Sequence, residues 1–183
     1  MKIKKNKTTI YCAGLILILL VWAIIFARTL SVFTISRTTL LIILSYIAMI
    51  IDINTKQIPN ALVLTMFAGW LLLVTPMLFI DTEYGIKIVV DSIYGLLLGC
   101  GLFLPVYLLS RKGLGGGDIK FMSVAGLYLG FSGTIPVILF GTVIAALTGL
   151  VLILLKKINR KDSIPLAPFL FIGILITVFM TRI

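Results

Sequence analysis

Long uncharged stretches alternate with short polar or basic segments along this chain, and the alternation predicts a series of membrane helices. Each stretch approaches the roughly 20 apolar residues that an α-helix needs to cross a bilayer. Four of them are well delimited: residues 10–27, 60–80, 88–110 and 164–181. Residues 38–51 form a shorter stretch, which is long enough to cross only if its helix continues through Asp52.

A further stretch, residues 119–155, is apolar except for Lys120 and is too long for one crossing. Ser132, Gly133 and Thr134 are turn-forming residues near its middle, so we expect the chain to reverse direction there. The predicted fold is therefore all-α: a polytopic integral membrane protein with about seven transmembrane helices.

The order of these stretches predicts one N-terminal helix followed by a six-helix membrane domain. We expect the first helix and a connector, residues 29–36, to lie within residues 1–37, and the six-helix domain to occupy residues 38–183. Residues 81–87 are expected to form a polar loop. The lysines before the first helix resemble those of a secretory signal peptide, which stays the alternative, although the apolar run is long and no convincing cleavage site follows.

Composition supports a membrane protein and excludes an ordinary soluble domain. Of the 183 residues 61% are hydrophobic, and only 16 Lys+Arg and 6 Asp+Glu carry charge. A soluble domain of this size could not keep so much apolar surface away from water.

The net charge of +10 is explained by membrane topology. With a cytoplasmic N-terminus, twelve basic residues fall on inner segments: Lys2, Lys4, Lys5, Lys7, Lys56, Arg111, Lys112, Lys120, Lys156, Lys157, Arg160 and Lys161. Four fall outside: Arg28, Arg37, Lys87 and Arg182. This positive-inside bias predicts a multi-pass protein of the plasma membrane with its N-terminus in the cytoplasm, and it removes the need to invoke nucleic-acid binding.

The residues that are missing or isolated exclude several chemistries. The chain has no His, and its two cysteines, Cys12 and Cys100, lie far apart within apolar runs. A His-dependent serine or cysteine triad is therefore excluded, as is a Cys-x-x-Cys redox or zinc motif. We expect no cofactor and no metal, so any chemistry must come from carboxylates, Lys, Tyr or hydroxyl groups.

Two acids stand out because the same topology places both at the cytoplasmic ends of membrane helices. These are Asp52 and Asp118. Acids at such positions are costly and mark functional sites. Asp162 lies in a basic loop, where a solvated role suffices. Asp91 lies near the outer interface with no partner visible, and we interpret it as a non-catalytic acid, either an ion-coupling group or part of a helix–helix hydrogen bond.

Two neighbouring aspartates are sufficient for peptide hydrolysis. They cannot both ionise easily at short range, so the pair is expected to share one proton. The ionised member can take a proton from an attacking water, while the protonated member polarises the carbonyl and later protonates the leaving amine. Lys56 and Lys120 could oppose this sharing of a proton, or extend to the membrane interface instead.

The glycines before Asp118, Lys120 just after it, and Pro59 and Asn60 at the start of the 60–80 helix are candidate supporting positions. Gly115, Gly116 and Gly117 either let an extended substrate strand approach Asp118 or only form the turn between two helices. We interpret Pro59 and Asn60 as residues that start a helix.

Three motifs resemble those of the type IV prepilin peptidases. Residues 52–60 are an Asp, a short basic stretch and then Ile-Pro-Asn; residues 113–120 contain Gly-x-Gly-x-Gly-Asp-Ile-Lys; and residues 164–170 contain Pro-x-x-Pro-Phe. The resemblance implies a membrane aspartic endopeptidase with Asp52 and Asp118 as its catalytic pair. It would cleave the basic leader of prepilin-like proteins just before their hydrophobic helix, on the cytoplasmic side.

One departure and several alternatives accompany this resemblance. Full-length bacterial members carry a cytoplasmic loop with paired cysteines that is associated with N-methylation, and nothing here matches it. We therefore expect peptidase activity without methyltransferase activity.

Three alternative functions remain. Within the peptidases, a presenilin-like enzyme would need Tyr before the first aspartate, where Ile51 stands. An ion-coupled transporter using Asp52 and Asp118 as proton sites is the alternative from another class, and a non-catalytic scaffold is the third.

Overall fold

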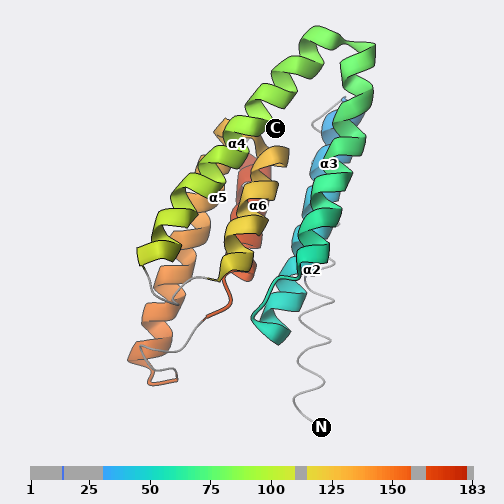
Figure 1. Ribbon diagram of the computed structural model, residues 1–183. Coiled ribbons are helices and arrows are strands. Elements are labelled where there is room, and N and C mark those ends of the chain that lie inside the picture. Colours follow the sequence, from blue (N-terminus) through green and yellow to red (C-terminus); the bar gives the residue numbers. More distant parts are fainter. Residues whose placement is uncertain (1–13, 15–30, 110–114, 158–163, 181–183) are drawn as a thin grey trace.

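The protein is all-helical over the part of the chain that the structure describes. The computed structural model describes residues 14, 31–109, 115–157 and 164–180 (Figure 1). Their helices are α2 (Val32–Thr55), α3 (Asn60–Ile80), α4 (Thr82–Leu109), α5 (Gly116–Leu154) and α6 (Ala167–Met180). The first four are long and apolar enough to cross a membrane, and α6 is a shorter apolar helix.

These helices confirm the prediction of an all-α membrane protein, whereas the count of seven crossings stays a prediction. The expected first helix, residues 10–27, lies outside the described residues except for Gly14, which is helical. The division into residues 1–37 and 38–183 also stays a prediction.

Helix α5 contains the reversal expected within residues 119–155, but at a different residue. Gly130 has φ 68° and ψ −175°, which interrupts the helix, and glycine adopts positive φ without steric cost. In Figure 1 the gold first half of α5 (residues 116–129) rises from the lower end, and the orange second half (residues 131–154) runs back down. The predicted turn residues instead lie inside the second half, where the Thr134 hydroxyl donates to the Gly130 carbonyl at 2.6 Å.

Asp91 stabilises this reversal from a neighbouring helix. Its carboxylate, on α4, accepts a hydrogen bond from the backbone N–H of Phe131 at 3.0 Å. Phe131 opens the second half of α5, where backbone N–H groups lack intrahelical acceptors. The helix–helix hydrogen bond, one of the two interpretations of Asp91, is therefore present, and its partner is a helix N-terminus.

Two predicted loop segments are helical. Helix α2 already begins at Val32, so most of the expected connector at residues 29–36 belongs to it, and it continues past Asp52 to Thr55. Helix α4 begins at Thr82, so the expected polar loop at residues 81–87 shrinks to a single turn residue. Polar side chains from the expected loop instead stabilise the first turns of α4, where Glu83 and Lys87 form a 2.7 Å ion pair one turn apart.

Helices α4 and α5 pack with their backbones in contact. A Cβ atom on Gly99 would lie 2.7 Å from the Met122 carbonyl oxygen, and Gly95 and Gly126 are similarly close to each other. Small residues at such positions allow membrane helices to approach closely. This packing fixes the first half of α5, which begins beside the candidate active site.

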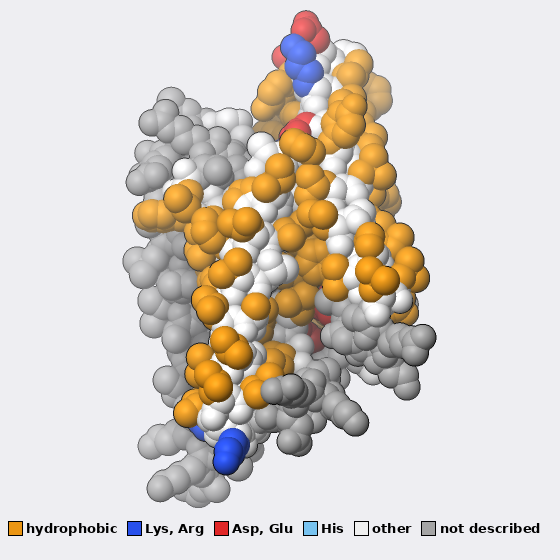
Figure 2. All heavy atoms as spheres, turned by 90° about the vertical axis from the view of Figure 1, so that its left-hand side faces the viewer, with side chains coloured by type: hydrophobic (Ala, Val, Ile, Leu, Met, Phe, Trp, Pro, Cys, Tyr) orange, Lys and Arg blue, Asp and Glu red, His pale blue; other side chains and the backbone are white. Residues whose placement is uncertain are grey.

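The outer surface has the layering that a bilayer requires. On the face in Figure 2, apolar side chains cover the middle of the molecule, while Lys, Arg, Asp and Glu gather mainly at its two ends. Leu97 on α4 and Leu147 on α5 are among the exposed apolar side chains. The two ends therefore fit the two aqueous faces of a membrane.

Candidate active site

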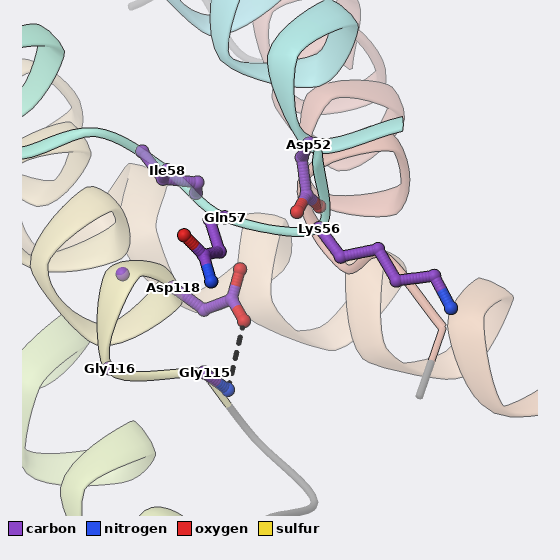
Figure 3. Close-up of a pocket in the computed structure, with 8 residues that line it drawn as sticks. Asp52, Lys56, Gln57, Ile58, Gly115, Gly116 and Asp118 are labelled. Carbon is purple, nitrogen blue, oxygen red and sulfur yellow. Dashed lines mark hydrogen bonds between the residues drawn. The ribbon is translucent and has the colours of Figure 1, made fainter. Parts of the chain in front are cut away.

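A cavity of about 390 Å³ at one end of the bundle brings the two predicted aspartates together. It is lined by Asp52, Lys56, Gln57, Ile58, Gly115, Gly116, Gly117 and Asp118 (Figure 3). Asp52 comes from the last turn of α2 and Asp118 from the first turn of α5. The sequence separates these aspartates by two helices, so the cavity exists only in the folded bundle.

Asp52 is held from the opposite side by the start of α6. Its side chain is only 3% exposed, and one carboxylate oxygen accepts the backbone N–H of Ala167 at 3.0 Å. Ala167 lies between Pro165 and Pro168, which have no N–H to donate. The segment that resembles the late Pro-x-x-Pro-Phe motif therefore orients the first aspartate.

Asp118 is held by the turn that precedes it. Its carboxylate accepts the backbone N–H of Gly115 at 3.2 Å, and its own N–H donates to the Gly115 carbonyl at 3.1 Å. This is the reciprocal arrangement that caps a helix start. Asp118 is half-buried, so one side of its carboxylate faces the cavity, as Figure 3 shows.

The connector between α2 and α3 supplies Lys56 to the cavity lining, together with Gln57 and Ile58, which the sequence analysis did not single out. Lys56 turns the chain with φ 53°, and its side chain extends away from Asp118 in Figure 3. Gln57 points its amide toward the Asp118 carboxylate. Ile58 is buried against Gly117, where an added Cβ would lie 3.2 Å from the Ile58 Cβ. Ile58 belongs to the Ile-Pro-Asn motif, and that is the one signal that could have identified it.

The remaining predicted site residues lie beside this cavity. Lys120 donates to the Asn60 side-chain oxygen at 2.9 Å, and both residues line an adjacent groove between α3 and α5. Pro59 is the N-cap of α3, and Asn60 is its first residue, as the helix-start interpretation predicts. The structure thus groups Gly115, Gly116 and Gly117 with the aspartates and places Pro59, Asn60 and Lys120 around them.

This arrangement offers two carboxylates to one solvent-accessible space, and hydrolysis needs no further ionisable group. Among the described residues, no three His, Cys, Asp or Glu side chains gather as metal ligands. The polar side chains that line the cavity are two carboxylates, the Lys56 amine and the Gln57 amide.

Comparison with known proteins identifies one family. The sequence profile of the Type IV leader peptidase family matches residues 38–150. A Prepilin leader peptidase/N-methyltransferase of Escherichia coli (strain K12) is 31% identical over 135 residues, covering 69% of this chain and 55% of the relative. Proteins with the same name are 28% identical over 128 residues in Aeromonas hydrophila (67% and 42% covered) and 36% identical over 87 residues in Bacillus subtilis (strain 168) (45% and 35% covered).

The chain spans about half the length of these curated relatives or less. No solved structure matches it significantly. The family profile covers more than half of the chain and includes both Asp52 and Asp118, although the segment around Pro165 lies beyond it. The resemblance drawn from the motifs is confirmed, and the chain belongs to the type IV leader peptidase family.

Proposed function

We propose that this chain is a membrane aspartic endopeptidase that removes the leader peptide of prepilin-like precursors, with Asp52 and Asp118 as its catalytic pair. The observation that carries the proposal is that both aspartates line one cavity at the same end of the bundle. The names of the relatives support the substrate class, since each is a prepilin leader peptidase.

The chemistry follows from the shared cavity. Two carboxylates in one confined space repel each other when both are ionised, so the pair holds one proton near neutral pH. The ionised aspartate accepts a proton from water as the water oxygen attacks the scissile carbonyl carbon. The protonated aspartate donates a hydrogen bond to the carbonyl oxygen, and a proton then passes to the leaving amine as the C–N bond breaks.

Backbone contacts allow each aspartate to keep its position through this cycle. Asp52 is bonded to Ala167 and Asp118 to Gly115, and in each case one oxygen makes the bond. The second oxygen of the Asp118 carboxylate lies outside this contact and can serve water or substrate. Positioning of this kind contributes to catalysis by removing the entropic cost of aligning the groups.

The test is leader cleavage of a prepilin-like substrate in membranes by the native chain, Asp52→Asn and Asp118→Asn. Asparagine is nearly isosteric but cannot transfer the proton, so we expect each variant to lose at least about 100-fold in cleavage rate. Asp81→Asn, which alters an exposed acid away from the cavity, is the control. Native-rate cleavage by either catalytic variant, at normal expression, would show that the two-aspartate mechanism is wrong.

We further propose that cleavage takes place at the cytoplasmic face of the plasma membrane, with the N-terminus on that side. The support is the excess of basic residues on inner segments. Lys56 and Lys120 come from the same end of the bundle as the two aspartates.

We also propose that the chain lacks the N-methyltransferase activity that appears in the relatives' name. The support is that Cys12 and Cys100, its two cysteines, cannot form the paired motif associated with that activity. Mass spectrometry of the cleaved product tests this: we expect an unmodified N-terminal amine. A product heavier by one methyl group, formed by the purified chain and a methyl donor, would refute it.

A further inference from the structure

We infer that a groove next to the catalytic cavity holds the apolar helix of the substrate that adjoins the cleaved bond. This inference rests on the proposed peptidase function. The groove measures about 500 Å³ and lies between α3 and the first half of α5. Asn60, Leu64 and Phe67 form its α3 side, and Lys120 and Val124 form its α5 side.

One face of α5 leads from the cavity into the groove. Gly117 lines the cavity, whereas Lys120 and Val124 line the groove. These residues are three and four positions apart, so they lie one above another on a helix. On the other side, Ile58 lines the cavity and Asn60, two residues later, lines the groove. A polypeptide bound at the aspartates therefore reaches the groove without leaving the protein surface.

The chemistry of the groove changes from polar to apolar along its length. The hydrogen-bonded pair Lys120 and Asn60 lies at the end nearest the cavity. Leu64 and Phe67 follow at intervals of four and three residues along α3, and both are exposed. From Asn60 to Phe67 the groove extends about 10 Å, which is about two helical turns. It thus suits a segment that is polar at the cleaved bond and apolar immediately after it.

The occupant must be helical because the groove lies within membrane-spanning helices. A polypeptide in the hydrocarbon region has to satisfy its backbone groups internally, and a helix does so. The α3 side of the groove is held in place by contacts with buried residues, which favours packing against a specific partner. The Phe67 ring stacks on Trp70 with centroids 6.2 Å apart, and the buried Trp70 indole donates to Ser92 on α4 at 3.3 Å.

A matched pair of leucines on α3 allows a direct test. Leu64 is 67% exposed and lines the groove, whereas Leu72 is 75% exposed and lies outside it. Leu64→Trp fills the groove, and Leu72→Trp adds the same bulk about two turns further along α3, outside the groove. Each variant is assayed on two substrates: a prepilin-like protein with its apolar helix, and a short peptide that spans only the cleavage site.

The quantity to compare is kcat/KM for the full-length substrate divided by kcat/KM for the short peptide. Because both are measured on one preparation, loss of folded protein cancels from this ratio. We expect Leu64→Trp to lower the ratio about tenfold, because the bulkier side chain occupies the space of the substrate helix; a tenfold change corresponds to about 1.4 kcal/mol. Leu72→Trp should leave it at the native value. An unchanged ratio in Leu64→Trp would overturn the inference while leaving the peptidase function standing.

Photo-crosslinking identifies the occupant independently. A photoreactive residue at position 64 or 72 is placed in the Asp118→Asn chain, and a tagged full-length substrate is added in membranes. We expect the substrate adduct from position 64 and not from position 72. An adduct of lipid alone at position 64 would show that the groove holds an acyl chain and overturn the inference. If the native chain cleaves neither substrate, the peptidase function fails and the groove proposal falls with it.

Discussion

The three glycines before Asp118 differ in the space around them, and this difference separates their roles. A Cβ atom on Gly115 would lie 3.0 Å from an Asp118 carboxylate oxygen, and one on Gly117 would lie 3.2 Å from Ile58. A Cβ atom on Gly116 would meet nothing within 4 Å. The fold therefore has room for a side chain at residue 116, so the absence of one there is not explained by packing.

We expect Gly116→Val to fold normally and to lose cleavage activity. The new side chain would project into open space beside the aspartates, where an extended substrate must pass, and cleavage should fall about tenfold or more. Thermal unfolding in detergent should stay close to the native midpoint, since surface substitutions usually change stability by less than about 0.5 kcal/mol.

Gly101→Val on α4 is the matched control for this change. A Cβ atom there also meets nothing within 4 Å, but the residue lies outside the cavity. Normal cleavage by Gly116→Val would mean that Gly116 only forms the turn. Lost expression of the variant would show that the turn itself cannot accept a side chain.

Between the helices, the closest packing is that of α4 against the first half of α5. This contact positions the cavity, since Asp118 lies in the first turn of α5. The reversal at Gly130 lies at the far end of the same half, where Asp91 accepts the Phe131 N–H. The first half of α5 is thus fixed at both ends and along its length.

We expect Gly99→Val to destabilise the bundle by about 1–3 kcal/mol, the usual cost of forcing extra bulk into a packed contact. Its first added carbon would lie 2.7 Å from the Met122 carbonyl oxygen, and backbone cannot move aside cheaply. The measurement is the thermal midpoint in detergent, with Gly101→Val, two residues along the same helix, as the control. Equal midpoints for the two variants would contradict a tight α4–α5 contact.

The molecule as a whole has two polar ends separated by an apolar zone, which is the basis for its orientation in a membrane. Glu83 and Lys87 form an exposed ion pair at one end. The aspartates lie at the other end, where Lys56 lines their cavity. The charge distribution predicts that the aspartate end faces the cytoplasm.

We expect a cysteine at residue 83 to react with a membrane-impermeant maleimide in intact cells. A cysteine at residue 157 should react only after the membrane is opened, because it follows the second half of α5 on the aspartate side. The two variants, Glu83→Cys and Lys157→Cys, are made in a chain whose Cys12 and Cys100 are serine. The reverse labelling pattern would invert the proposed topology.

Sequence patterns were sufficient for the helical class, for α3 and for placing Asp52 and Asp118 at the same end of the bundle, because each depends on local composition or on charge counting. The start of α2 was harder to predict because Ser36, a polar residue in the expected connector, donates to the Val32 carbonyl at 2.8 Å and is compatible with a helix. The sequence predicts the reversal at Ser132, Gly133 and Thr134 because these residue types favour turns, but the Thr134 hydroxyl also bonds within the helix, to the Gly130 carbonyl. The true position of the reversal depends on Asp91, which is 40 residues from its partner Phe131 and cannot be paired with it by spacing. The role of Ile58 depends on its tertiary contact with Gly117.

The hydrogen bond between Asp52 and Ala167 has a consequence for biosynthesis. The two residues are 115 positions apart, and Asp118 lies between them. During translation Asp52 is made early and remains without its donor until α6 leaves the ribosome and joins α2 in the membrane. The cavity can form once the segment around Asp118 is in place, but Asp52 gains its orienting hydrogen bond only when α6 arrives. The orientation of Asp52 is therefore fixed by a helix that is synthesised after both aspartates.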